Sequence, residues 1–230
     1  MLIVKDLSVE YADGKRAVDS VSLALAPGES VALVGANGAG KTTLLLALVG
    51  VLAAKSGEVF LDELALVKKT APEFRARIGL VFQNPDDQLF MPNVFEDVAF
   101  GPRSFGHGEE ETKERVENAL DRLQISHLRD RSPLKLSGGE KRLAAIATVL
   151  SMQPEYMLFD EPTAYLDPRA RRNLRRIVND LPQGKLIATH DLTFAADTCS
   201  RVVMLKDGAV VADGGIDCLK DEGLLEAAGL

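Results

Sequence analysis

A glycine-rich loop is the clearest chemical feature of the sequence. Residues 35–42 read Gly-Ala-Asn-Gly-Ala-Gly-Lys-Thr and fit the pattern G-x-x-x-x-G-K-[ST] at every position. In such a loop, glycines let backbone N–H groups curl around phosphate oxygens, and the following helix N-terminus adds partial positive charge. The pattern predicts that Lys41 reaches the β- and γ-phosphates of a nucleotide and that Thr42 coordinates Mg²⁺. The loop alone indicates only a phosphate binder, because kinases, GTPases and transport ATPases share it. The predicted binding residues are Gly35, Asn37, Gly38, Ala39, Gly40, Lys41, Thr42 and Thr43.

Two adjacent carboxylates, Asp160 and Glu161, follow the apolar run at residues 156–159. Ligands of open α/β sheets gather at the carboxyl ends of the strands, so we expect both acids at the binding edge. Neighbouring side chains of an extended segment point in different directions, which lets the two acids divide the work. We expect Asp160 to hold Mg²⁺, partly through water, and Glu161 to act as general base on the attacking water. A solvated acidic turn is the alternative for the pair taken alone.

A second glycine-containing segment reads Leu-Ser-Gly-Gly-Glu at residues 136–140 and precedes an apolar helix; we call it the Ser-Gly-Gly segment. Ser137 and Glu140 form the pattern of a capping box. The capping box does not explain Gly138 and Gly139, each of which costs about 1 kcal/mol of helix propensity. Close approach of a phosphate to the positive helix end would explain them. The chain would then carry two anion sites, and two chains meeting about a twofold axis could grip one nucleotide between them.

Strands that alternate with helices are expected to position these residues. Alternating apolar residues predict strands through Leu7, Val9 and Tyr11 and through residues 21–25, each with one buried face. The run 31–34 predicts a strand buried on both faces, followed by the glycine-rich loop and a helix near 41–54. Further strands are predicted at 59–61, 78–82, 156–159 and 186–189, a hairpin at 202–212, and helices near 109–123 and 138–150. Another helix is predicted between the strands at 156–159 and 186–189, with Leu174, Ile177, Val178 and Leu181 on one face. This alternation predicts an α/β fold with a mostly parallel sheet and a helical insert.

Composition limits the classes of function. The 230 residues carry a formal net charge of -7, which argues against general binding to a nucleic-acid backbone. The two cysteines, Cys199 and Cys218, form no Cys-x-x-Cys pair, and we expect both to be reduced. The longest apolar run, at residues 44–54, is shorter than the roughly 20 residues of a membrane-spanning helix. Any membrane role is therefore expected to come through a partner.

The order of the motifs along the chain resembles that of the ABC-transporter ATPase family. The similarity covers essentially the whole chain and rests on residues 35–42, 136–140, 160–161 and 189–191. It implies ATP and Mg²⁺ as ligands, ATP hydrolysis as the reaction, and the P-loop NTPase fold with an N-terminal antiparallel β portion. It also implies one ATPase domain over residues 1–230, with a core at about 1–88 and 151–230 and a helical subdomain at about 89–150. By this resemblance Ser137, Gly138 and Gly139 contact the γ-phosphate in a partner's site.

The same resemblance implies roles for single residues. Gln83 resembles the glutamine that touches Mg²⁺ and the attacking water, and His190 resembles the histidine that contacts the γ-phosphate and supports Glu161. Tyr11 matches the aromatic residue that stacks on adenine, although packing within its strand is the alternative. Asp167 lies in the loop that joins the two active sites. Tyr165 departs from the small residue that is usual just before that loop.

The middle of the chain resembles a narrower group, the ATPases of energy-coupling factor importers, which take up vitamins, cobalt or nickel. The resemblance rests on residues 82–90 and 94–102, while residues 136–150 and the short C-terminus are most similar to the cobalt/nickel type. It implies a motor subunit at the cytoplasmic face of the cell membrane. Its expected partners are a second ATPase subunit in a homo- or heterodimer, a transmembrane coupling subunit and a membrane protein that captures the substrate. Gln88 and residues 89–100 would dock on the coupling subunit, unless Phe90, Phe95 and Phe100 merely pack the insert.

Two other functions compete with the cobalt or nickel importer. One is an energy-coupling factor motor for vitamin uptake. The three histidines form no local cluster with cysteine that would bind a transported metal, so any selectivity for cobalt or nickel is expected to come from membrane partners. The other is a soluble ABC ATPase of DNA repair or translation, which the basic stretch at 169–176 could suggest. We interpret that stretch as the solvated face of a helix and expect no nucleic-acid partner.

Overall fold

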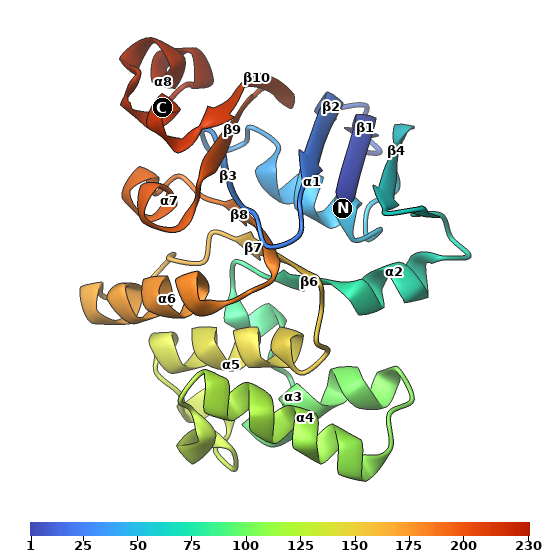
Figure 1. Ribbon diagram of the computed structural model, residues 1–230, viewed down its shortest axis with the longest axis vertical. Coiled ribbons are helices and arrows are strands. Elements are labelled where there is room, and N and C mark those ends of the chain that lie inside the picture. The colour runs from blue at the N-terminus through green and yellow to red at the C-terminus, as the bar shows by residue number, and fades with distance from the viewer.

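The chain folds into two β-sheets with helices around them (Figure 1). The computed structural model describes all residues from 1 to 230. The larger sheet has six strands in the order β10-β9-β3-β8-β7-β6. Its strands are β3 (Ser30–Val34), β6 (Ile78–Val81), β7 (Tyr156–Asp160), β8 (Gly184–Ala188), β9 (Arg201–Lys206) and β10 (Ala209–Gly215). Only β10 is antiparallel to its neighbour, which confirms the predicted mostly parallel sheet.

The smaller sheet is antiparallel and is formed by strands from the first 65 residues of the chain. Its four strands follow the order β2-β1-β4-β5. They are β1 (Leu2–Glu10), β2 (Arg16–Leu25), β4 (Ser56–Leu61) and β5 (Leu64–Ala65). Helix α1 (Lys41–Leu48) packs between the two sheets, so its apolar residues are buried on all sides rather than on one stripe.

Helices α2 (Ala71–Arg77), α6 (Pro168–Asp180), α7 (Leu192–Thr198) and α8 (Glu222–Ala228) lie around the larger sheet. Four short 3₁₀ turns lie between the longer elements: η1 (Pro85–Asp87), η2 (Ser126–Leu128), η3 (Pro133–Lys135) and η4 (Ile216–Lys220). The consecutive helices α3 (Val94–Ser104), α4 (Glu109–Arg122) and α5 (Gly138–Leu150) form a separate layer, far from the antiparallel sheet (Figure 1). This layer is the predicted helical insert, and its treatment as a subdomain stays a prediction.

The buried residues form two apolar clusters, one on each face of the parallel sheet. Strand β3 contributes to both, with Val31 and Leu33 in the cluster that contains α1, and Ala32 and Val34 in the cluster on the opposite face, where α7 packs. This confirms the prediction of a strand buried on both faces. No helix combines the length and apolarity that crossing a bilayer would require.

Two predicted element boundaries are wrong. The helix expected to reach residue 54 ends at Leu48, because Gly50 adopts the left-handed conformation that stops helices. Tyr11 lies beyond β1 rather than in it, since its N–H bonds the Lys15 carbonyl in a turn, 2.9 Å away. The turn frees the Tyr11 ring from the packing of the sheet.

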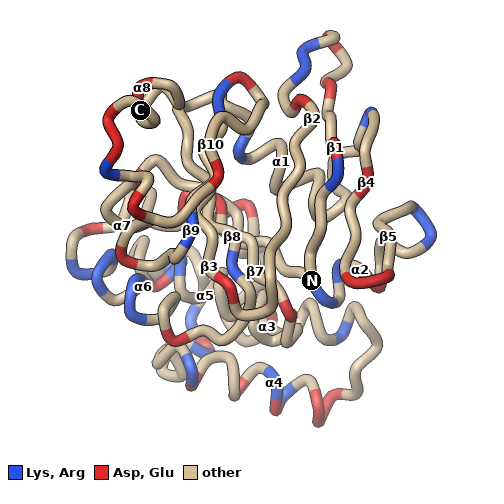
Figure 2. The backbone as a smooth tube through the Cα atoms, turned by 45° about the horizontal axis from the view of Figure 1, so that its top comes forward, with Lys and Arg blue, Asp and Glu red and all other residues tan.

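Helix α6 carries the basic stretch as interpreted from the sequence. Leu174, Ile177 and Val178 are buried against the core, whereas Arg172 and Arg176 are exposed. Figure 2 shows the basic segments of α6 on the outside of the molecule. The solvated-face interpretation of this stretch is confirmed.

Candidate functional site

Strand order brings four chain segments to one edge of the parallel sheet. From β3 to β6 the sheet runs β3-β8-β7-β6, and all four strands are parallel. Their carboxyl ends carry, in that order, the glycine-rich loop, the segment at 189–191, the acidic pair at 160–161 and the segment that begins at Phe82. Residues more than 100 positions apart in the sequence therefore meet at the sheet edge where ligands bind.

The glycine-rich loop joins β3 to α1 in a conformation that needs glycine. Gly38 and Gly40 have φ angles of 84° and 102°, and Gly40 is the N-cap of α1. A Cβ on Gly40 would lie 2.2 Å from the Ala17 carbonyl oxygen, whereas one on Gly38 would meet nothing within 4 Å. The loop is thus held tightly at its helical end and open at its centre, where backbone N–H groups are free to face an anion.

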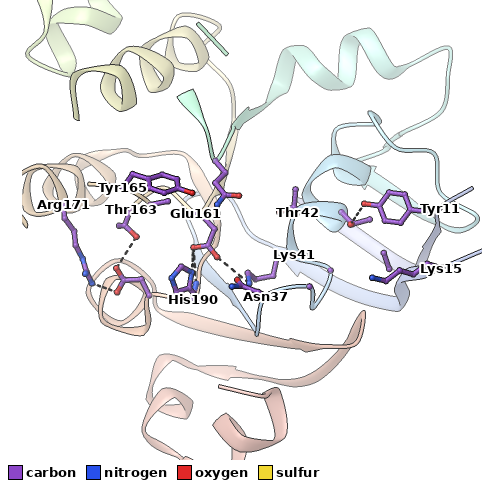
Figure 3. Close-up of a pocket in the computed structure, with 17 residues that line it drawn as sticks. Tyr11, Lys15, Asn37, Lys41, Thr42, Glu161, Thr163, Tyr165, Arg171 and His190 are labelled. Atoms are coloured by element: carbon purple, nitrogen blue, oxygen red, sulfur yellow. Dashed lines mark hydrogen bonds and ion pairs between the residues drawn. The ribbon is translucent and has the colours of Figure 1, made fainter. Parts of the chain in front are cut away.

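Lys41 is buried and points into the loop. Its Nζ donates to the carbonyl oxygens of Gly35 and Ala36 at 2.7 and 3.2 Å, and lies 3.6 Å from Glu161 Oε1 (Figure 3). The ammonium group therefore lies between the loop and the acidic pair. A cation in this place is suited to bind phosphate oxygens next to a carboxylate.

Thr42 and Asp160 form an oxygen-rich pair beside Lys41. The Thr42 hydroxyl donates to Asp160 Oδ2 at 2.8 Å, while Asp160 Oδ1 is buried and has no hydrogen-bond partner. Burial raises the pKa of Asp160, and the Thr42 hydrogen bond opposes the shift. An unpartnered buried carboxylate oxygen next to a hydroxyl matches the hard oxygen ligands that Mg²⁺ prefers. The residues fit the predicted ion.

Glu161 is held from two sides. Its Oε2 accepts from Thr189 Oγ1 and from the His190 N–H, both at 3.3 Å, and lies 2.9 Å from His190 Nδ1. The other oxygen faces Lys41. Glu161 also has a left-handed φ of 43°, which non-glycine residues adopt mainly where the surroundings demand it. Its carboxylate is therefore fixed in place, while the His190 side chain is 61% exposed at the mouth of the site.

A cleft of about 900 Å³, which we call the first cleft, joins these groups. The predicted residues that line it are Tyr11, Asn37, Gly38, Gly40, Lys41, Thr42, Thr43, Gln83, Glu161 and His190. Tyr11 lies at the end away from His190, with its hydroxyl 2.8 Å from Thr43 Oγ1 (Figure 3). Gly35, Ala39 and Asp160 lie behind this surface, where Ala39 and Asp160 are buried and the Gly35 Cα packs against the Leu205 carbonyl.

The Ser-Gly-Gly segment does not reach the first cleft. Ser137, Gly138 and Gly139 line a second cleft of about 640 Å³ together with Asp167. The capping box is present, with Glu140 Oε2 accepting from the Ser137 N–H at 2.8 Å. The two predicted anion sites of one chain are therefore separate surfaces.

Tyr165 lies between the two clefts. It lines both of them, is 90% exposed and adopts a left-handed φ of 61°. Asp167, two residues later, caps α6 by accepting from the N–H groups of Arg169 and Ala170 at 2.8 Å. A bulky side chain thus projects from the short connection between the clefts.

The segment expected to dock on a membrane partner divides into inward and outward side chains. Gln88 points inward, and its amide donates to Ala145 O and Thr148 Oγ1 at 2.8 Å, so its side chain is not part of a docking surface. Phe95 packs against Arg129, whose guanidinium lies 4.3 Å from the ring centre. Phe90 and Phe100 are 63% and 45% exposed and stack edge to face at 5.1 Å. Packing therefore accounts for Phe95, whereas Phe90 and Phe100 form an exposed aromatic pair.

Several residues of the site received no predicted role from the sequence, although Asp191 belongs to the motif at 189–191. Asp191 accepts from Thr163 Oγ1 at 3.2 Å and pairs with Arg171, and all three line the first cleft. Arg142 is buried one helical turn after the Ser-Gly-Gly segment and donates to backbone carbonyls. Contacts between distant segments and bonds to the backbone leave no pattern in the sequence that could have revealed them.

The sequence of residues 18–164 matches the protein family described as ABC transporter. A Geobacter sulfurreducens protein named as an ABC transporter ATP-binding protein is 49% identical over 211 residues, which cover 92% of this chain and 85% of the relative. An energy-coupling factor transporter ATP-binding protein, EcfA, of Carboxydothermus hydrogenoformans is 43% identical over 230 residues, which cover 99% of this chain and 85% of the relative.

Two solved structures share the fold closely. The structure of cbiO1 from Clostridium perfringens, described as part of the ABC transporter complex cbiONQ, has a TM-score of 0.86 and 35% identity, with 98% of this chain and 93% of that chain covered. A dimeric post-hydrolysis state of the ATP-binding cassette MJ0796, bound to ADP and Pi, has a TM-score of 0.82 and 27% identity. That match covers 94% of this chain and 99% of the other.

The loop geometry predicts unequal costs for two alanine substitutions. Gly38→Ala places a side chain in open space and should lower the free energy of unfolding by about 1–2 kcal/mol, the cost of a left-handed alanine. Gly40→Ala adds a collision with the Ala17 carbonyl and should cost at least about 1 kcal/mol more. Urea denaturation of both variants measures the difference, and equal losses would contradict the described loop conformation.

Proposed function

The chain belongs to the ABC transporter family, and from this premise we propose that it is the motor subunit of an energy-coupling factor importer. It is an ATP-binding, ATP-hydrolysing subunit of an ABC transporter. The observation that carries the proposed mechanism is the meeting of Lys41, the Thr42–Asp160 pair and the Glu161–His190 pair at one sheet edge. The importer type rests on the resemblance of residues 82–102, on relatives named EcfA and on the likeness to cbiO1.

We propose that the glycine-rich loop binds the phosphates of ATP. Lys41 exchanges the carbonyl oxygens of Gly35 and Ala36 for β- and γ-phosphate oxygens, which carry more negative charge. Tyr11 stacks on the base at the far end of the first cleft. Thr42, Asp160 and Gln83 would hold Mg²⁺, which would supply positive charge next to the phosphates when bound.

Glu161 is the proposed general base. It accepts a proton from a water whose oxygen attacks the γ-phosphorus, and the bond to the bridging oxygen breaks to release ADP and phosphate. His190 and Thr189 hold the carboxylate in the orientation this transfer needs. His190 is exposed at the cleft mouth and is proposed to contact the γ-phosphate as well.

A second ATPase subunit is proposed to complete each site. The Ser-Gly-Gly segment lies in the second cleft, so it can contact the γ-phosphate only in a site whose glycine-rich loop comes from another chain. This chain carries both the glycine-rich loop and the Ser-Gly-Gly segment. A second copy of the chain or a related ATPase subunit could therefore provide the Ser-Gly-Gly segment that completes each site. Two ATP molecules would favour the closed dimer through contacts absent from the open form, and hydrolysis would reopen it.

The exposed aromatic pair is proposed to dock on a transmembrane coupling subunit. Exposed neighbouring aromatic rings are typical of protein–protein contact sites.

A separate membrane protein would capture the substrate, because no group of three or more His, Cys, Asp or Glu side chains is placed to bind a transported metal here. The subunit would act as a peripheral protein at the cytoplasmic face. Cobalt or nickel is the proposed cargo on the sequence resemblance of residues 136–150, with a vitamin as the alternative.

Substitution of the general base should separate binding from hydrolysis. Glu161→Gln should lower ATP turnover at least about 100-fold, since general-base catalysis is typically worth 10²–10⁴-fold. ATP binding should persist, and the variant should accumulate as an ATP-bound dimer in size-exclusion chromatography. Glu110→Gln is the matched control, because it makes the same chemical change at an exposed residue of α4 and should stay within about twofold of wild type. Near-normal turnover of Glu161→Gln would contradict the assignment.

Removal of the aromatic pair should release the membrane partners without affecting the ATPase. Wild-type protein expressed with its neighbouring genes should co-purify with polytopic membrane proteins, and Phe90→Ser/Phe100→Ser should not. Val67→Ser, at another exposed apolar residue, should retain the partners. ATP turnover of the isolated variants should match wild type. Full retention of the membrane proteins by the double variant would contradict this docking site.

A further inference from the structure

Arg142 is a buried cation without a carboxylate partner. It is 1% exposed, and the structure has no ion pair to it. Burial lowers the pKa of Arg142 to about 10, and the negative charge of Asp160 opposes the shift. Its Nε is also buried without a hydrogen-bond partner. Such an arrangement is unfavourable unless the guanidinium group makes other strong contacts.

Those contacts are two backbone carbonyls in a row. Nη1 donates to Phe82 O and Nη2 donates to Gln83 O, each at 2.6 Å. Phe82 is the first residue after β6, so the two bonds fix the backbone where the chain leaves the sheet. The planar fork of an arginine matches two neighbouring acceptors, which a lysine cannot bind in the same way.

Simpler contacts already tie the same segment to α5. The Gln88 amide bonds Ala145 and Thr148 of α5, and Lys141 bonds Asp86 at 2.6 Å near the surface. These contacts hold the segment without burying an unpaired charge. Arg142 alone acts on the backbone of Gln83 itself, so its unfavourable burial calls for a role at that residue.

The position of Arg142 connects the two clefts. It lines the second cleft with the Ser-Gly-Gly segment, which belongs to the same helix one turn earlier. Its guanidinium reaches the backbone of Gln83, whose side chain lines the first cleft. We propose that Arg142 is a positioning residue that holds Gln83 in its working place and ties that place to the Ser-Gly-Gly segment. This inference rests on the proposed function, in which Gln83 contacts Mg²⁺ and the attacking water.

The consequence is a link between the two composite sites of a dimer. A displacement of α5 when its Ser-Gly-Gly segment meets the partner's nucleotide would be carried by Arg142 to Gln83 of the same chain. That glutamine serves the other nucleotide. Arg142 would thus adjust one site according to the occupancy of the other, without touching either nucleotide.

A double-mutant cycle tests the role. Steady-state ATP hydrolysis is measured for wild type, Arg142→Lys, Gln83→Ala and the double variant, at varied ATP and Mg²⁺. Arg142→Lys should lower kcat about tenfold, change the KM for ATP less than about twofold and raise the Mg²⁺ concentration needed for half-maximal rate. In the Gln83→Ala background the same substitution should cost less than about twofold, because the side chain it positions is gone. Lys141→Gln, which removes the neighbouring surface contact, is the control and should behave as wild type.

The kinetic outcomes distinguish a failure of the positioning role of Arg142 from a failure of the proposed role of Gln83. If Arg142→Lys costs the same factor with and without the Gln83 side chain, the positioning role is overturned while the proposed function stands. If Gln83→Ala leaves turnover and Mg²⁺ dependence unchanged, the proposed role of Gln83 is wrong and the inference falls with it.

Amide hydrogen exchange provides a second measurement, which depends neither on ATP turnover nor on small losses in global stability. The amides at 82–84 should exchange faster in Arg142→Lys and those of β6 should not, and unchanged exchange at 82–84 would overturn the proposal.

Discussion

A buried ammonium group and a buried carboxylate face each other across the ends of two strands, and the geometry of the site depends on this contact. Lys41 Nζ lies 3.6 Å from Glu161 Oε1, and both side chains are almost fully shielded from solvent. Removal of one charge from such a pair would leave the other unpaired, at a cost of about 3–5 kcal/mol. The pair therefore holds the glycine-rich loop after β3 and the acidic turn after β7 in mutual register. Strand β8 lies between these two strands and supplies Thr189 and His190, which bond the remaining oxygen of the carboxylate.

The division of the chain into two clefts follows from the same architecture. The first cleft collects residues from the carboxyl ends of parallel strands, whereas the Ser-Gly-Gly segment begins a helix of the separate helical layer. Both surfaces suit phosphate, but they do not meet within one chain. They can contact the same nucleotide only if another subunit brings its complementary surface to each of them. Tyr165 lines both clefts and is the most exposed aromatic residue of the chain, so it lies where such a subunit would make contact.

Features that depend on local interactions could be predicted from the sequence. The glycine-rich loop between a buried strand and a helix, the capping box at Ser137 and the hairpin of β9 and β10 each depend on residues close together in the chain. The helix end at Leu48 was missed because the left-handed Gly50 outweighs the apolar run that continues past it. Gln88 was expected at the surface and turns inward, since its partners on α5 are about 60 residues away in sequence. Arg142 bonds only backbone oxygens, which every sequence has, and so no pattern of residue types could indicate it.

Mixing two inactive variants tests most directly whether two chains share each site. Lys41→Ala removes the cation of the glycine-rich loop, and Ser137→Arg blocks the Ser-Gly-Gly segment. In a mixed dimer one site carries both lesions and the other carries neither. Equal amounts of the two variants should therefore recover about a quarter of wild-type ATP turnover, since half the dimers are mixed and each has one intact site. No recovery, under conditions where the wild-type chain hydrolyses ATP, would contradict the shared site.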